Sequence, residues 1–593
     1  KITKLYDGLE RDMQETWAIH GVYPTFAWTP DDRAIVFWAK GGIWRIDVAT
    51  REVKPIPFHV SGTRQATEAV RFPIAVAPDR FEVKALRDVA VSPAGNQVVY
   101  VALGRLYTRA LPDGTPRRLT TQNDHWEAAP SFSRDGRQIV YTTWNDQKLG
   151  SIRIAAASGG EGRVITTEPG HYVEPCFTPD GARVVYRKTT GGGLISDLWS
   201  QDPGIYVTPA AGGEPRRVVK WGRSPRFGSQ NDRVYLLDRE GEKAALKAVN
   251  LDGSDVKTVV TSADATDMVV APDERWIAFK ELWNAYVVAF PPTGQTTEIG
   301  PKSTAVPLRR LTRDAGENLQ WSSASNKVYW SLGPELFERD LKDAFPFLPD
   351  AAEKAAEAPE KGRNISFTQT YDNPPGAIAL TGARIVTMRG DEVIENGTVV
   401  VEGRKITAVG ASVKIPAGAK TVDVKGKTII PGLIDVHAHG GQAENDFVPQ
   451  QSWVNYAALA FGITTVHDPS NDTNSIFAAS ELAKAGMIVG PRTFSTGTIL
   501  YGAAGDFRAE INSLDDAKSH LRRLKAVGAF SVKSYNQPRR EQRQQVIAAA
   551  RELGMMVVPE GGSLFEHNMT MVADGHTGVE HAIPVAHIYD DVL

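Results

Sequence analysis

Two histidines, His437 and His439, stand two positions apart at the end of an apolar run that begins at Thr428. Residues i and i+2 of a β-strand point to the same side, so a buried strand here would direct both imidazoles to one point. A neutral imidazole offers a lone pair that binds a transition metal. Such a metal lowers the pKa of a bound water toward neutrality and polarises a carbonyl oxygen, which is the chemistry of amide hydrolysis. The pair therefore indicates a metal centre at the carboxyl end of a strand.

The residues before the pair make this indication specific. The run Pro431-Gly432-Leu433-Ile434-Asp435-Val436-His437-Ala438-His439 resembles the motif that opens the catalytic barrel of the amidohydrolase superfamily. The resemblance implies a (β/α)8 TIM-type barrel and one or two divalent metal ions, zinc above all. It also implies hydrolysis of carbon–nitrogen bonds other than ordinary peptide bonds, in small-molecule substrates such as cyclic amides, N-acyl amino acids or proline dipeptides.

The same resemblance implies ligands on later strands. Lys533 ends the predicted fourth strand, where the family has a lysine that is carbamylated and bridges two metals. His581, in Gly578-Val579-Glu580-His581-Ala582, is similar to the sixth-strand motif of the imidazolonepropionase-like and prolidase-like branch. The expected metal ligands are therefore His437, His439, Lys533, Glu560 and His581.

Glu560 departs from the family pattern, which has a histidine at the end of the fifth strand. A carboxylate also binds zinc or manganese, so Glu560 is kept among the ligands. Alternatively, Glu560 pairs with an uncarbamylated Lys533 and leaves one metal or none.

Two further residues, His467 and Asp468, end the predicted second strand and are candidates for the substrate pocket. The family takes its proton-transferring aspartate from the end of strand 8. We expect that residue to lie beyond Leu593, so no catalytic base is assigned.

Strand-like and helix-like segments alternate through this part of the chain, as in a barrel. Helices are predicted over 453–461, 475–485, 514–527 and 539–553, and strands over 463–467, 492–496, 530–535, 555–559 and 577–581. With the strand that carries His437, these make six of the eight strands of a barrel, which is therefore incomplete.

A different pattern fills the first part of the chain. Seven turns rich in Ser, Thr, Pro, Asp and Gly each precede a short β-branched and aromatic run: Trp28–Asp32, Val91–Gly95, Phe132–Gly136, Phe177–Gly181, Phe227–Asn231, Val270–Glu274 and Trp321–Ser325. Their third residues are 63, 41, 45, 50, 43 and 51 positions apart, near the roughly 40 to 50 residues of a four-stranded propeller blade. The pattern predicts an all-β propeller of about seven blades, and the Ser/Thr-Pro-Asp-Gly turn resembles TolB-like propellers.

Four aromatic residues of this region, His125, Trp126, His171 and Trp221, have two interpretations. They either line a central channel that binds peptide or substrate, or fill the space between blades. Repeated aromatic residues usually pack between blades, which favours the second interpretation.

The chain is thus predicted to be multidomain. A propeller spans 1–345, a linker rich in Ala, Glu, Lys and Pro spans 346–364, a small β-sandwich spans 365–427, and the amidohydrolase-like barrel spans 428–593.

Composition limits the partners. A net charge of -3 gives no electrostatic reason to bind nucleic acid or an anionic membrane, and no apolar run approaches the roughly 20 residues of a membrane span. The single cysteine, Cys176, excludes a thiolate zinc site and an intrachain disulfide. We expect a homo-oligomer, and the combined architecture resembles exported bacterial hydrolases, which implies a periplasmic or secreted protein.

Two other functions stay open from the sequence. In one, the protein is a non-catalytic peptide- or protein-binding molecule whose barrel has lost its metal at Glu560. In the other, the propeller binds a peptide or protein partner and the barrel is the enzyme that it serves.

Overall fold

The computed structural model describes residues 2–9, 25–39, 42–59, 61, 63, 66–76, 78–190, 201–290, 294–444, 447–535, 537, 539–561 and 565–581. The chain forms two compact units. The propeller unit consists of Ile74–Gly497 and Ala526–Gly528, and the terminal unit consists of Lys1–Pro73, Thr498–Lys525 and Ala529–Leu593. Within the described ranges, no helix is long and apolar enough to cross a membrane.

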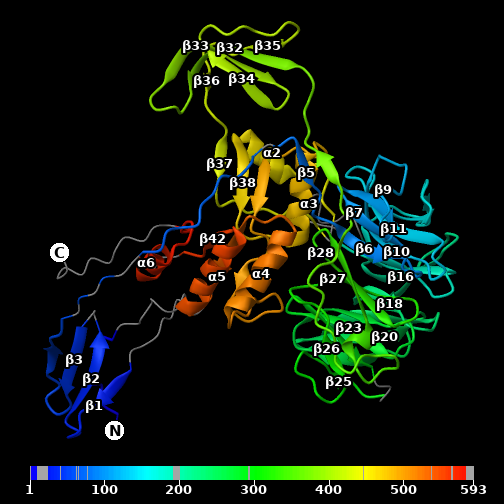
Figure 1. The fold of residues 1–593 in the computed structure, drawn as a ribbon, viewed down its shortest axis with the longest axis horizontal. Coiled ribbons are helices and arrows are strands. Elements are labelled where there is room, and N and C mark those ends of the chain that lie inside the picture. Colours follow the sequence, from blue (N-terminus) through cyan, green and yellow to red (C-terminus); the bar gives the residue numbers. More distant parts are fainter. Residues whose placement is uncertain are drawn as a thin grey trace. The chain divides into compact units, whose positions relative to one another are not determined.

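Six successive sheets form the first part of the propeller unit (Figure 1). Each has four antiparallel strands, and one gains a short fifth strand that pairs in parallel. In chain order the sheets are β6 (Arg87–Val91), β7 (Gln97–Ala102), β8 (Arg105–Ala110), β9 (Arg117–Arg118); β10 (Trp126–Phe132), β11 (Gln138–Trp144), β12 (Ser151–Ala156), β13 (Arg163–Val164); β14 (Tyr172–Phe177), β15 (Arg183–Lys188), β16 (Gly204–Pro209), β17 (Arg216–Val219); β18 (Arg223–Phe227), β19 (Arg233–Glu240), β20 (Lys243–Asn250), β21 (Lys257–Ser262), β25 (Thr297–Glu298); β22 (Ala265–Val270), β23 (Trp276–Glu281), β24 (Asn284–Ala289), β26 (Leu308–Arg310); and β27 (Glu317–Trp321), β28 (Lys327–Leu332), β29 (Glu335–Asp340), β30 (Arg363–Asn364).

These sheets close into a ring. The first strand of each sheet contacts the first strand of the next, and β27 of the sixth sheet returns to β6 of the first. The side-chain amide of Gln320 joins the two ends: Oε1 accepts from the N–H of Val91 at 2.7 Å, and Nε2 donates to its carbonyl oxygen at 2.7 Å. In the described part of the chain, the ring therefore has six blades.

The seven predicted turns all form, each between the first and second strand of a sheet. The first turn, however, belongs to the sheet β1 (Phe26–Trp28), β2 (Ala34–Ala39), β3 (Gly42–Asp47) and β4 (Val53–Ile56), which lies in the terminal unit. The expectation of about seven blades counted this sheet, and the long first spacing of 63 residues marked its separation from the ring.

A cavity of about 310 Å³ runs between the first strands of the blades. Each strand contributes to the wall, through Asp88, Ala129, Glu174, Arg226, Val269 and Asn318 respectively. The strands bulge at this level, and four of these residues, Asp88, Ala129, Glu174 and Asn318, have left-handed backbone φ angles between 49° and 55°. A bulge re-aims side chains, here toward the channel.

His125, Trp126, His171 and Trp221 are not among the residues that line this cavity. The first three are at most 6% exposed, and Trp221 packs against a buried cluster beside Leu236. Trp126 and Trp221 pack in clusters formed by neighbouring blades, which agrees with the second interpretation. The ring of His171 lies 5.0 Å from that of Phe447, a residue that follows the propeller in the chain.

A small β domain follows the ring. Its strands are β32 (Ala377–Val386), β33 (Val393–Glu402), β34 (Lys405–Gly410), β35 (Lys420–Asp423) and β36 (Thr428–Ile429). They form one hydrogen-bonded sheet in the order β34-β33-β32-β35, with β36 also paired to β32. The predicted sandwich is therefore a single sheet here, because the long β32 pairs with β35 along one half and with β36 along the other.

The predicted linker, 346–364, ends in a strand of the propeller. Helix α1 (Leu341–Ala344) precedes the linker, and β30 at its end pairs with β29 and completes the sixth blade. A second link ties this segment to the start of the propeller, since β31 (Thr368–Thr370) pairs with β5 (Arg80–Glu82).

The α/β part contributes one parallel sheet to each unit. In the propeller unit, β37 (Leu433–Asp435), β38 (Ile463–Asp468) and β39 (Arg492–Ser495) alternate with α2 (Trp453–Ala460) and α3 (Thr473–Lys484). In the terminal unit, β40 (Leu500–Tyr501), β41 (Ser531–Tyr535) and β42 (Met556–Pro559) alternate with α4 (Leu514–Ala526), α5 (Arg540–Leu553) and α6 (Phe565–Asp574). Parallel strands alternating with helices match the predicted rhythm, and closure into a barrel stays a prediction.

Two expectations about these strands were wrong. Residues 577–581 do not form a strand, because His581 has a left-handed φ of 65° that extended backbone does not allow. The run before the histidine pair is also exposed rather than buried: Ile434 and Val436 are 66% and 68% exposed. The reason is that β37 is an edge strand whose described pairing is to β38 alone.

Candidate metal centre

The histidine pair converges as the sequence predicts. Strand β37 ends at Asp435, whose carboxylate Oδ1 accepts the N–H of His437 at 3.0 Å. The pairing with β38 continues one residue beyond, where the N–H of Ala438 donates to the carbonyl oxygen of His467 at 3.0 Å. With the backbone held in this way, the Nε2 atoms of His437 and His439 lie 3.0 Å apart.

This separation suits two ligands of one metal. Zinc–nitrogen bonds of about 2.0–2.1 Å at a tetrahedral angle place two nitrogens about 3.3 Å apart. The side chain of His439 is 51% exposed, so a metal and its water can reach the pair.

Asp468 lies behind the second histidine. Its Oδ1 is 3.5 Å from Nδ1 of His439, the ring nitrogen that faces away from His437. Metal-binding histidines generally donate their second N–H to a carboxylate, which fixes the tautomer and the ring plane. The structure therefore gives Asp468, predicted as a pocket residue, a contact of the kind that orients a ligand.

The surroundings of Asp468 hold it rigidly. It is 2% exposed, accepts the N–H of Ser470 at 2.9 Å and accepts Nδ2 of Asn471 at 2.7 Å. Burial raises the pKa of this carboxyl above its usual value, while Asn471, Ser470 and His439 act in the opposite direction. Nδ2 of Asn471 also donates to the carbonyl oxygen of Gly440 at 2.8 Å, which ties the strand ends of β37 and β38 together.

The other three candidate ligands meet in the terminal unit. Nζ of Lys533, at the carboxyl half of β41, lies 2.7 Å from Oε2 of Glu560. Oε1 of the same carboxylate lies 2.7 Å from Nε2 of His581. The side chains of Lys533 and Glu560 are only 2% and 9% exposed, and this contact is compatible with either interpretation of Glu560, as a metal ligand or as the partner of an uncarbamylated lysine.

The two sets belong to different compact units. The propeller unit holds His437, His439, His467 and Asp468, and the terminal unit holds Lys533, Glu560 and His581. Over the described ranges, no group of three or more His, Cys, Asp or Glu side chains has the spacing of a metal site. The five-ligand set therefore stays a prediction, supported by the fit of the histidine pair.

Two residues of this region were missed in the sequence. Asn471 gave no signal because a lone asparagine after a strand is ordinarily a loop residue. Tyr501, on the two-residue strand β40, pairs with Tyr535 at the end of β41, and its ring centroid lies 5.7 Å from that of Tyr535, which is itself 5.3 Å from Nζ of Lys533. A strand of two residues is too short to show a period.

Known proteins match separate parts of the chain. Residues 87–286 match the TolB beta propeller domain. The chain is 26% identical over 216 residues to dihydroorotase of Geobacter metallireducens, covering 34% of this chain and 47% of the relative. It is 40% identical over 86 residues to imidazolonepropionase of Yersinia pseudotuberculosis, covering 13% and 21% of the two chains.

Solved structures are similar only in part. TolB from Acinetobacter baumannii covers 54% of this chain and 76% of its own at 14% identity and a TM-score of 0.32. A Xaa-Pro dipeptidase with bound methionine covers 35% and 61% at 18% identity and a TM-score of 0.30.

The chain spans less than half of the length of the dihydroorotases that it matches. The chain contains a TolB-type β-propeller domain and is a distant homologue of amidohydrolases, among them dihydroorotase and imidazolonepropionase.

Proposed function

We propose that this protein is a metal-dependent hydrolase of carbon–nitrogen bonds in small amides or cyclic amides. The observation that carries the proposal is the convergence of His437 and His439, with Nε2 atoms 3.0 Å apart. The contact of Asp468 with the outer nitrogen of His439 supports it, as does the distant similarity to amidohydrolases.

The residues divide the work as follows. His437 and His439 would hold the first metal, and Asp468 keeps the ring of His439 in the orientation that binds it. A divalent metal such as zinc supplies an acidified water and polarises the amide carbonyl. Lys533, Glu560 and His581 would complete the ligand set for one or two ions, with Lys533 carbamylated if it bridges.

The pair of Lys533 and Glu560 favours a second candidate function. An ion pair at 2.7 Å between these buried side chains would give each charge a counterion without a metal. In that case the protein is a non-catalytic binding molecule, and the charged channel between the blades would receive a peptide or protein.

Metal content separates the two functions. The protein would be purified, incubated with zinc or manganese and bicarbonate, desalted and assayed by plasma emission spectrometry. The hydrolase requires one to two equivalents of metal per chain, and a Glu560→Gln variant should retain less of it. Absence of stoichiometric metal under these conditions would leave the binding function.

A matched control accompanies the variant. Glu552 lies in the same unit, and its Oε2 is 2.7 Å from Nζ of Lys518 at the surface. A Glu552→Gln protein should keep the metal content of the unsubstituted protein. A loss of metal in both variants would show that Glu560 has no special role.

A further inference from the structure

Part of the loop between the histidine pair and α2 packs against the propeller. Phe447 and Val448 of this loop, residues 440–452, are 4% and 5% exposed. The ring of Phe447 lies 5.0 Å from that of His171 and 6.0 Å from that of Trp144, measured between centroids. Both of these residues belong to the propeller. His171 directly precedes β14, and Trp144 is the last residue of β11.

A propeller carboxylate anchors the same loop. Oδ1 of Asp146 accepts the N–H of Gln450 at 3.0 Å, and Oδ2 accepts the N–H of Gln451 at 2.7 Å. In return, Oε1 of Gln450 accepts the N–H of Asp146 at 3.2 Å. Nε1 of Trp144 donates to Oδ1 at 2.8 Å and fixes the carboxylate from the propeller side. Hydrogen bonds to a charged acceptor are stronger than those between neutral groups.

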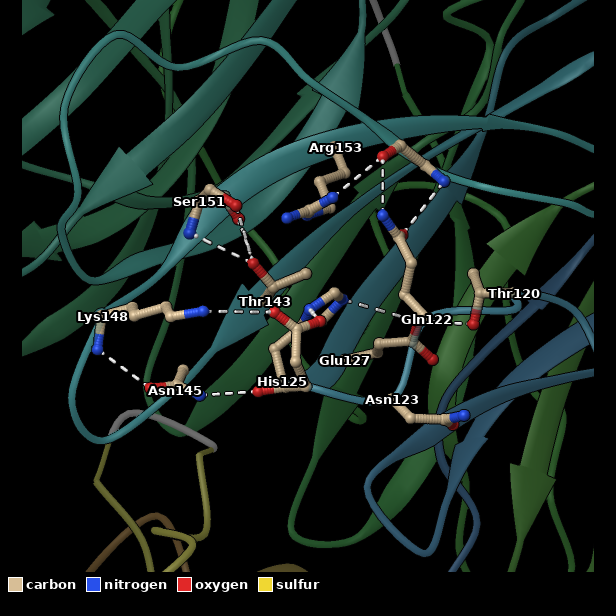
Figure 2. A network of polar contacts seen from close by, with 12 residues as sticks. Thr120, Gln122, Asn123, His125, Glu127, Thr143, Asn145, Lys148, Ser151 and Arg153 are labelled. Atoms are coloured by element: carbon tan, nitrogen blue, oxygen red, sulfur yellow. Dashed lines mark hydrogen bonds and ion pairs between the residues drawn. The ribbon is translucent and has the colours of Figure 1, made fainter.

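The turn between β11 and β12, which carries Asp146, is held in place by Asn145, and Figure 2 shows Asn145 and Lys148 of this turn. Oδ1 of Asn145 accepts the N–H groups of Gln147 and Lys148 at 2.9 Å, and its Nδ2 donates to the carbonyl oxygen of Asp124. The neighbouring His125, 4% exposed, contacts the side chain of Asp124 at 2.8 Å. The turn that carries Asp146 is therefore held by hydrogen bonds of its own, in addition to those that Asp146 makes to the loop.

The two candidate metal ligands, His437 and His439, lie directly before this loop. His439 precedes Gly440 directly, and its side chain is half exposed, so its own packing restrains it little. Its position depends on the course of the backbone on either side. Strand pairing fixes the backbone before it, and the bond from Asn471 to Gly440 fixes the backbone directly after it. Asp146 holds the far end of the same loop at Gln450 and Gln451.

We infer that the propeller is a structural support of the metal centre and that Asp146 is a positioning residue for His437 and His439. This inference rests on the proposed function, because it assigns a role in metal binding to residues about 300 positions away in the sequence. Holding ligands in place before the metal arrives raises affinity, because ordering them then costs nothing at the moment of binding.

The test compares Asp146→Ala and Asp146→Asn with the unsubstituted protein. Asp135→Ala serves as the matched control, because Asp135 accepts comparable bonds from Ser133 and Arg137 in a turn of the same sheet. Hydrogen exchange of residues 447–452 reports the anchor, and titration with Co²⁺ reports affinity and, through its visible spectrum, the geometry around the histidines.

Asp146→Ala should accelerate exchange of these residues about tenfold or more, because the two side-chain bonds to the N–H groups of Gln450 and Gln451 are lost. It should also weaken Co²⁺ binding by about 10- to 100-fold and alter the spectrum, as the loss of an orienting contact does elsewhere. Asp146→Asn, which keeps one acceptor oxygen, should fall between the two, and Asp135→Ala should match the unsubstituted protein.

Each negative result would contradict a different part of the inference. Unchanged exchange in Asp146→Ala would overturn the anchor. Faster exchange with unchanged Co²⁺ affinity and spectrum would overturn the positioning role while leaving the hydrolase proposal intact. If the unsubstituted protein binds no Co²⁺ or Zn²⁺, the proposed function falls, and the positioning role falls with it.

Discussion

At the scale of single residues, the ring of His439 lies between two groups. One nitrogen faces His437 and the other faces Asp468, so the carboxylate restricts rotation of a half-exposed side chain. Asp468 is buried and accepts two further hydrogen bonds, which keep it from following the ring. The orientation of the ligand thus depends on a residue that would not touch the metal.

Asp468→Asn should therefore weaken zinc binding by about 10- to 100-fold without unfolding the sheet. The amide retains the size of the carboxylate and one acceptor but loses the charge that favours the correct tautomer. Competition of the protein with a chromophoric chelator would measure the change. Asp180→Asn, in a propeller turn where Asp180 accepts from Thr178, should leave the affinity unaltered; equal affinity in Asp468→Asn would refute the orienting role.

The buried pair of Lys533 and Glu560 makes a second prediction. Glu560→Gln leaves the Lys533 cation, 2% exposed, without its counterion and should cost about 3–5 kcal/mol of local stability in metal-free protein. Removing the charge as well, in Lys533→Met combined with Glu560→Gln, should restore most of that loss. Hydrogen exchange of β41 and β42 would give both free energies, and equal stability of the single and double variants would contradict the pairing.

The sequence predicts that His437 and His439 converge, because two positions on one strand are enough to define the pair. It could not predict the role of Asp468. A carboxylate at the end of a second strand can line a substrate pocket or contact a neighbouring histidine ring, and the sequence does not distinguish the two. Asp146 carried no signal at all, because its partners Gln450 and Gln451 are brought to it only by the fold.

At the scale of elements, α3 joins the α/β part to the propeller through Glu481. This side chain is 5% exposed and accepts the N–H of Lys84 at 2.7 Å and that of Ala85 at 3.3 Å, just before β6. Burial raises the pKa of Glu481 from 4.5 to about 7, against the effect of those N–H groups and of Lys484. Near neutral pH this contact is therefore close to its titration point.

The sign of the pH effect follows from the raised pKa. The folded protein holds the proton more tightly than the unfolded chain, so the stabilisation is complete below about pH 4.5 and is lost as pH rises through about 7. The loss amounts to about 3 kcal/mol at most. Melting temperatures measured between pH 5 and pH 8 should fall as pH rises, once other titrating groups are subtracted.

Glu481→Gln isolates this contribution. The amide oxygen can still accept the N–H of Lys84, but it does not titrate, so the variant should lose stability less steeply across the same range. An exposed control, Glu541→Gln, should follow the unsubstituted protein. Parallel curves for Glu481→Gln and the unsubstituted protein would show that Glu481 does not titrate in this window.

Local signals explain which elements could be predicted. Turns such as Phe177–Gly181 were located correctly because Thr178 and Asp180 bond within the turn itself. The sequence predicts a strand over 577–581 because Thr577 and Val579 are β-branched. The N–H of Thr577 does donate to the carbonyl oxygen of Val557 in β42, but residues 577–581 form no strand, and the chain turns at His581. Exposure of β37 was beyond prediction, since it depends on which strands lie beside it.

At the scale of the whole molecule, Gln320 is one of the side chains that join the last blade to the first, together with Ser323, whose hydroxyl donates to the carbonyl oxygen of Pro93 at 3.0 Å. The side-chain amide of Gln320 donates one hydrogen bond to the backbone of Val91 and accepts another from it. These bonds join two neighbouring sheets that are not linked by strand pairing. Both bonds are shorter than 2.8 Å and partly buried. The seam between blades therefore depends on a residue that neither blade needs for its own sheet.

Gln320→Ala should destabilise the ring by about 1–3 kcal/mol, because a backbone N–H and a carbonyl group lose their partners. Exchange at β6 and β27 should accelerate more than exchange at β15, on the far side of the ring. Gln147→Ala, at an exposed position, should change neither. Uniform acceleration over all blades would indicate general unfolding and not an opened seam.

The terminal unit joins residues from opposite ends of the chain. Nη2 of Arg71 donates to the carbonyl oxygen of Thr577, whose hydroxyl donates to that of Val70, and the N–H of Thr67 donates to Ala573. Partners separated by 506 and 507 residues leave the ribosome about 25–100 s apart at about 5–20 residues per second. During that interval the entire six-bladed ring can fold, while the segment near Arg71 has no partner and is open to proteases and chaperones. Pulse-labelled nascent chains should therefore lose this early segment to limited proteolysis until synthesis has passed Thr577.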